Sequence, residues 1–171
     1  MSWVDQVKDS IRDHAKDIKL NLDAVINRSG LDEVDAHACA FAAAVAAGNG
    51  DLAFEISMNG PLAGTTEREA AKTAAALMGM NNVYYPFVEM TGDSDLKGLP
   101  PGLRMNAYAT HGGVTKKKFE MYALAASIVG KCHFCVKNHY DTLKKEGMTV
   151  QELQAVGKIA AVVAAVGKVA L

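Results

Sequence analysis

The residues in this chain with the clearest chemistry lie close together in the sequence. Two of the three cysteines, Cys132 and Cys135, form a C-x-x-C pair, and His139 follows the second cysteine by four residues. Glu120 precedes the first cysteine by twelve residues. If the segment is helical, positions i, i+3 and i+7 share one face, so both thiols and the imidazole point the same way. Such a group can form a disulfide, relay a proton or bind a metal.

The spacing suits an activated thiol. The thiolate is the reactive form of cysteine, and a helix N-terminus lowers the pKa of a thiol near it. Gly130 marks such a helix start just before Cys132. His139 lies one turn beyond Cys135 and can take its proton directly or through one water. Glu120 can orient or charge that imidazole, as a carboxylate does in a catalytic triad. These parts suit thiol–disulfide exchange or peroxide reduction through a sulfenic acid.

Two other interpretations of the same residues stay open. One is a metal-binding or interaction module, whose candidate ligands are Cys132, His133, Cys135 and His139. Structural zinc usually draws on two separated ligand pairs, whereas these candidates lie within eight residues of one helix. The other is simple packing, which is also what we expect of Cys39 in its Ala-rich segment. A zinc module would lose its fold when chelators remove the metal.

The elements that position these residues are expected to be helices. Half of the residues are hydrophobic but only 6% are aromatic, and alanine far outnumbers valine and isoleucine. This composition favours closely packed helices over sheets. No segment alternates apolar and polar residues over the length of a strand. The sequence therefore predicts an all-α fold, with residues 1–171 as a single domain.

Periodicity and stop signals divide the chain into helices. We expect them over about residues 2–16, 17–26, 32–49, 52–58, 67–80, 81–90, 116–129, 132–146 and from 149 onward. Pro86 should interrupt its helix, and residues 92–102 (GDSDLKGLPPG) should form a surface loop. Capping-box patterns open two of the helices, namely Thr66 with Glu69 and Thr149 with Glu152.

The two halves of the chain resemble each other. A shift of 51 residues lays Glu69 on Glu120 and also aligns alanines and a glycine. The first copy carries no cysteine or histidine at the positions of the second copy's site. We interpret this as an internal two-fold repeat, with a degenerate half over about residues 32–91 and an active half over about 103–171. The alternative is chance similarity between Ala-rich helices.

Charge and hydropathy exclude several classes of function. The net charge is −1 with both signs mixed along the chain, so there is no basic footprint for nucleic acid or an anionic membrane. The first residues, MSWVDQVKDS, lack the apolar core of a signal peptide. No apolar run reaches the roughly 18 residues of a membrane span. A leaderless chain with three cysteines is expected in the reducing cytoplasm.

The pattern E-x11-C-x2-C-x3-H resembles that of the AhpD-type alkylhydroperoxidases, in the carboxymuconolactone decarboxylase superfamily. The similarity also covers AKDIKLNL (residues 15–22), MGMNNVYY (78–85) and GLRMN (102–106), and so runs nearly end to end. It implies an all-helical homotrimer with an internal repeat and no bound cofactor beyond a redox-active disulfide. It also implies that the protein reduces a peroxiredoxin of the alkyl hydroperoxide reductase C type, and weakly reduces alkyl hydroperoxides itself. Electrons would come from dihydrolipoamide on a lipoyl-bearing 2-oxoacid dehydrogenase component.

The resemblance also implies roles for individual residues. Cys135 would be the nucleophile that forms the sulfenic acid or the mixed disulfide. Cys132 would be its proton donor and its partner in a Cys132–Cys135 disulfide. Glu120 and His139 would form the relay that activates Cys135, with water. A carboxymuconolactone-type decarboxylase on the same scaffold is the enzymatic alternative, but its chemistry needs no cysteine pair.

One position departs from the family pattern. The family members compared carry histidine immediately before the second cysteine, where this chain has Phe134, and His133 stands one residue earlier. A shift of one residue turns a helical side chain by about 100°. His133 is therefore a candidate for the relay only by proximity, and the family role does not pass to it directly.

Overall fold

The computed structural model describes residues 2–169, which form α-helices and two short 3-10 helices but no strand. The α-helices are α1 (Trp3–Ser10), α2 (Lys16–Asn27), α3 (Glu33–Ala46), α4 (Gly50–Met58), α5 (Thr66–Thr91), α6 (Ser94–Gly98), α7 (Asn106–Ala109), α8 (Lys116–Gly130), α9 (His133–Lys145) and α10 (Val150–Val166). The 3-10 helices are η1 (Asp13–Ala15) and η2 (His111–Gly113). The all-α prediction is confirmed. None of the helices over residues 2–169 combines the length and hydropathy needed to cross a bilayer.

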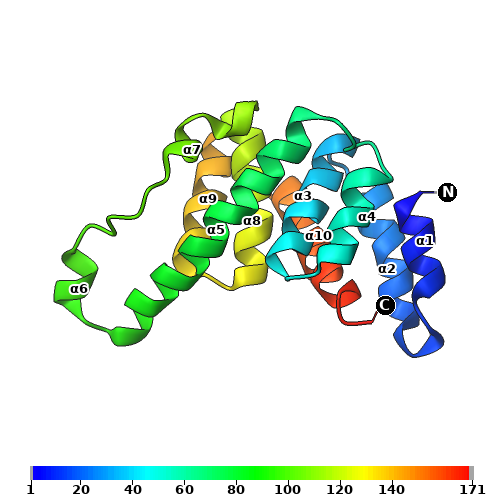
Figure 1. The fold of residues 1–171 in the computed structure, drawn as a ribbon, viewed down its shortest axis with the longest axis horizontal. Helices are drawn as coiled ribbons and strands as arrows, with labels where there is room; N and C mark the ends of the chain where they lie inside the picture. Colours follow the sequence, from blue (N-terminus) through cyan, green and yellow to red (C-terminus); the bar gives the residue numbers. More distant parts are fainter. Residues whose placement is uncertain (1, 170–171) are drawn as a thin grey trace.

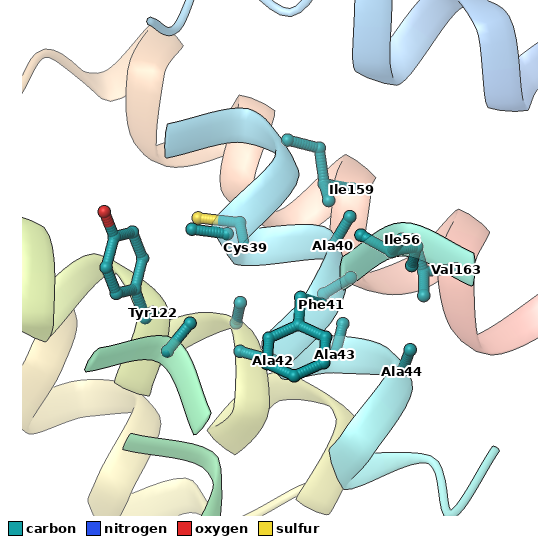
Figure 2. Packing of buried hydrophobic residues seen from close by; sticks show 14 of the residues in the cluster. Cys39, Ala40, Phe41, Ala42, Ala43, Ala44, Ile56, Tyr122, Ile159 and Val163 are labelled. Atoms are coloured by element: carbon teal, nitrogen blue, oxygen red, sulfur yellow. The ribbon is translucent and has the colours of Figure 1, made fainter. Parts of the chain in front are cut away.

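The core is built around α3, which packs against α4, α5, α8 and α10. Its buried face is largely alanine, and small side chains let neighbouring helices approach closely. Figure 2 shows this run beside Tyr122 of α8 and Ile159 of α10. Cys39 lies within this run, fully buried and with a free thiol, so the prediction that it is a packing residue is confirmed.

The long helix α5 differs from the sequence prediction. It runs unbroken from Thr66 to Thr91 with Pro86 inside it, so the expected interruption is wrong. Packing of α5 against α3, α8 and α9 stabilises the continuous helix and outweighs the free-energy cost of a proline inside it. Its N-cap is Thr65, whose hydroxyl accepts from the backbone N–H of Arg68, so the predicted capping position is one residue late.

The segment after α5 is also more ordered than predicted. Residues 94–98 form the short helix α6, because Asp93 caps it by accepting from two backbone N–H groups. Figure 1 shows α6 and the far end of α5 projecting away from the other helices. The second predicted capping box, Thr149 with Glu152, is confirmed at the start of α10.

Candidate active site

The cysteine pair lies where α8 turns into α9. Lys131 adopts a left-handed conformation at φ 55°, and the next residue, Cys132, is the N-cap of α9. Cys132 therefore precedes the helix instead of lying inside it as predicted, and Lys131, not Gly130, makes the break. The backbone N–H of Cys135 donates to Cys132 Sγ over 3.2 Å. This contact places the Cys132 sulfur at the positive end of α9.

Gly130 does not mark the start of the cysteine helix, as predicted, but allows close packing between α8 and α5. It is the last residue of α8, and a Cβ there would overlap the side-chain amide of Asn82 on α5. Asn82 uses that amide to donate to the carbonyl of Ala126, 3.2 Å away. The glycine thus lets the end of α8 lie directly against α5, which fixes the turn that carries the cysteines.

Cys132 and Cys135 are joined by a disulfide, with their Cα atoms 5.3 Å apart. Both residues are buried. The C-x-x-C pair is therefore close enough to cycle between dithiol and disulfide without a large backbone movement. The structure describes the oxidised form.

Glu120 and His139 form a buried acid–base pair beside the cysteines. Glu120, on α8, is 2% exposed and His139, on α9, is 6% exposed. His139 Nδ1 donates to Glu120 Oε2 over 2.6 Å, which leaves Nε2 as the nitrogen able to take up a proton. Nε2 faces Met78 Sδ at 3.1 Å.

The charge of Glu120 follows from its surroundings. Burial alone would raise its pKa, but hydrogen bonds from His139 and from the Tyr108 hydroxyl outweigh burial and lower the pKa. Glu120 is therefore ionised at neutral pH. Its carboxylate can support a positive charge on the imidazole.

A cavity of about 250 Å³ joins these groups. Cys135, Glu120 and His139 all line it, and Cys132 is not among its lining residues. Cys135 and His139 are four residues apart on α9, a spacing that puts side chains on the same face of a helix. The remaining walls are mostly apolar and include Met78, Tyr85, Met105 and Phe134.

His133 is not brought to this cavity. Its side chain is 81% exposed and pairs with Glu89 on α5 at 2.9 Å. Phe134, which follows it, stacks on Tyr85 with ring centroids 4.2 Å apart. At the two positions that depart from the family pattern, the ring of Phe134 therefore lines the cavity, whereas the imidazole of His133 lies outside it.

Three residues at the site were missed by sequence reasoning. Tyr108, Met78 and Asn81 come from α7 and α5, far from the cysteines in sequence. The available signal was that two of the segments carrying the family resemblance, MGMNNVYY and GLRMN, contain or adjoin them. Spacing along the chain could not show that these segments meet at one cavity.

The metal interpretation gains no geometric support. Within residues 2–169, no three His, Cys, Asp or Glu side chains converge in a way that could hold a metal ion. Both candidate sulfur ligands are joined in the disulfide. A disulfide-forming cysteine pair beside a buried carboxylate and imidazole is instead an arrangement that suits a thiol oxidoreductase.

Comparison with known proteins agrees with that class. Residues 95–170 match the carboxymuconolactone decarboxylase family. Over 170 residues the chain is 40% identical to the alkyl hydroperoxide reductase AhpD of Rhodospirillum centenum, covering 97% of this chain and 89% of the relative. The AhpD of Maricaulis maris is 37% identical over 97% of this chain and 96% of its own. The AhpD of Coxiella burnetii is 39% identical over 96% of this chain and 94% of its own length.

The matches to the three AhpD relatives extend over nearly the whole chain, so they concern the fold and the site together. The chain belongs to the AhpD alkyl hydroperoxide reductases, within the carboxymuconolactone decarboxylase family.

Proposed function

We propose that this enzyme is an antioxidant thiol oxidoreductase in which Cys135 attacks the peroxide. The observation that supports the proposal most is that Cys135 lines the same cavity as the Glu120–His139 pair, whereas Cys132, the N-cap of α9, is not among the lining residues. His139 Nε2 takes the thiol proton of Cys135. The thiolate then attacks one oxygen of the hydroperoxide and breaks the O–O bond, which leaves a sulfenic acid on Cys135.

Cys132 completes the cycle. It gives its proton to the departing alkoxide, and the hydrogen bond from the Cys135 N–H together with the field of α9 stabilises the thiolate left behind. That thiolate attacks the Cys135 sulfur and forms the disulfide. Hydroxide leaves and takes the proton held by His139. The net reaction converts one hydroperoxide and two thiols into an alcohol, water and one disulfide.

Reduction of the disulfide needs an external dithiol, and we propose dihydrolipoamide carried by a lipoyl-bearing 2-oxoacid dehydrogenase component. The same cysteines would reduce a partner peroxiredoxin through a mixed disulfide. A groove of about 960 Å³ supports an approach from the α9 side. It adjoins the active-site cavity, since Tyr85, Phe134 and Asn138 line both. A dithiol cycle of this kind fits the reducing cytoplasm.

We further propose that the enzyme assembles as a homotrimer. Support comes from apolar side chains left uncovered on the projecting end of α5, where Val83 is 71%, Phe87 48% and Met90 80% exposed. Their spacing of i, i+4 and i+7 places them on one face of the helix. A second copy of the chain would cover such a face.

The activity is tested with purified protein, dihydrolipoamide and tert-butyl hydroperoxide, with and without a peroxiredoxin. Peroxide loss and free thiols are followed for the wild type, Cys135→Ser and Cys132→Ser. Cys39→Ser, which changes a buried cysteine that does not line the cavity, is the matched control. We expect turnover in the wild type and the control and none in either site variant. Turnover that survives Cys135→Ser would overturn the assignment of the nucleophile.

A further inference from the structure

The carboxylate of Glu120 has a second partner that the cysteine segment does not supply. One oxygen, Oε2, accepts from His139 Nδ1, and the other, Oε1, accepts a hydrogen bond from the hydroxyl of Tyr108. Glu120 is almost completely buried. A buried carboxylate that loses a donor becomes costly to keep charged and gains freedom to turn. The two bonds together hold it in one orientation.

Tyr108 is anchored so that its hydroxyl stays on Glu120. Its ring packs edge-on against Phe119 at 5.4 Å. The turn after Tyr108 lies directly against α5. Gly112 in this turn has φ 59°, and a Cβ there would overlap Ala70. At the start of α7, the N-cap residue Met105 accepts at Sδ from the side-chain amide of Asn81, 3.5 Å away. These contacts fix α7 from both ends and leave Tyr108 little freedom to leave the carboxylate.

The hydroxyl remains a donor over the working range of pH. Burial, the hydrogen bond to Glu120 and the charge of Glu120 all raise the pKa of Tyr108 far above its usual value. Tyr108 also lines the same cavity as Cys135. The hydroxyl therefore stays a donor to Glu120 at the wall of the cavity that Cys135 also lines.

We propose that Tyr108 is a positioning residue of the thiol relay, holding Glu120 charged and turned toward His139. This inference rests on the proposed thiol chemistry and adds a residue to it. Without the hydroxyl, Glu120 would support the imidazole less well, and Cys135 would give up its proton less readily. The titratable or charged groups around Glu120 are, in chain order, Tyr108, His111, Lys116, Cys135 and His139. On the α5 side, the cavity walls include the uncharged Met78 and Asn81.

The test is the pH dependence of Cys135 alkylation in a Cys39→Ser, Cys132→Ser background, where Cys135 is the sole thiol. Tyr108→Phe removes the hydroxyl but keeps the ring against Phe119. We expect its alkylation profile to lie at higher pH than that of the parent. At neutral pH we expect about tenfold slower alkylation, since a hydrogen bond to a charged group is worth at least the free energy of a tenfold change.

Tyr122→Phe is the matched control. It removes another buried tyrosine hydroxyl, which donates to Asp35 over 2.6 Å and lies outside the cavity. Its profile should coincide with that of the parent. Circular dichroism checks the fold of every variant, and Tyr108→Leu is a second way to remove the hydroxyl.

The role of Tyr108 and the proposed thiol chemistry can be contradicted separately. Coincident alkylation profiles for the parent and a folded Tyr108 variant would overturn the role of Tyr108, whatever the peroxidase assay shows. A wild type that turns over no peroxide would overturn the proposed function, and a shifted profile would still establish the effect of Tyr108 on the thiol.

Discussion

Glu120 is buried and yet ionised, and its negative charge lies directly against the imidazole of His139. Hydrogen bonds to both oxygens outweigh the burial that would raise its pKa, so the carboxylate stays ionised next to His139. Because Nδ1 of His139 is bound to this carboxylate, Nε2 is the ring nitrogen left to accept a proton. In the proposed mechanism the proton comes from the thiol of Cys135, which lies four residues before His139 on α9 and lines the same cavity.

Glu120→Gln tests this at the residue scale. The amide cannot carry the charge, so we expect peroxide turnover to fall by about a hundredfold. The pKa of Glu120 is lowered, so the relay is intact above that pKa and is lost as the pH falls through it. The variant should therefore lose this acid limb from its rate profile, measured as peroxide consumption against pH.

Glu69→Gln is the control for that variant. Glu69 is the residue that the 51-residue shift aligns with Glu120, but its side chain is 59% exposed and pairs with Arg68. It should show wild-type turnover and a wild-type pH profile. If Glu120→Gln behaves in the same way, the carboxylate is not part of the relay.

At the scale of elements, the site depends on three helices that meet closely. α8 brings Glu120, α9 brings Cys135 and His139, and α5 lies against both. The close approach of α8 to α5 rests on Gly130, where any side chain would collide with Asn82. The turn at Lys131 and Cys132 follows directly, so a shift of α8 would move the cysteine pair relative to His139.

Gly130→Ala should therefore lower both stability and activity. We expect a loss of about 1–3 kcal/mol in the free energy of unfolding, the usual cost of overpacking. Gly157→Ala is the matched control, since it lies within α10 with no atom near an added Cβ. There alanine should be neutral or stabilising by up to about 1 kcal/mol. Denaturant titration of both variants measures the difference, and equal stabilities would contradict the packing argument.

The sequence predicted the local parts of this arrangement and missed the long-range ones. The spacing of the two cysteines and His139, and the capping box of Thr149 with Glu152, depend on neighbours along the chain. Tyr108 could not be found in this way, because its partner Glu120 lies across a turn whose path is set by packing on α5. The internal repeat stays a prediction.

Two further differences have the same origin. The helix through Pro86 persists because packing of α5 against its neighbours outweighs a local penalty. Cys132 was predicted inside α9 but caps it, since the left-handed Lys131 delays the helix by one residue. Element boundaries set by a single residue's conformation are difficult to read from periodicity.

At the scale of the whole molecule, the projecting end of α5 exposes apolar side chains that no other part of the described chain covers. Figure 1 shows it extending with α6 away from the helical body. Val83, Phe87 and Met90 expose apolar surface along it. Exposed apolar faces of this kind mark interaction sites in many proteins.

We expect the wild type to sediment as a trimer and the double variant Phe87→Lys, Met90→Lys to sediment as a smaller species. Charged side chains on this face would have to be buried without partners in the assembly. Phe54→Lys, a change at a 60% exposed phenylalanine on α4, should leave the assembly intact. Sedimentation equilibrium compares the three, and a monomeric wild type would contradict the proposed assembly.

The most direct test of the central claim is a single-turnover experiment on the fully reduced enzyme. One equivalent of alkyl hydroperoxide is added, and peptide mapping by mass spectrometry locates the oxidised sulfur. We predict one alcohol formed per chain, loss of the thiol hydrogens of Cys132 and Cys135 as their disulfide forms, and an unchanged Cys39 thiol. Unreacted peroxide, or oxidation confined to Cys39, would contradict the account.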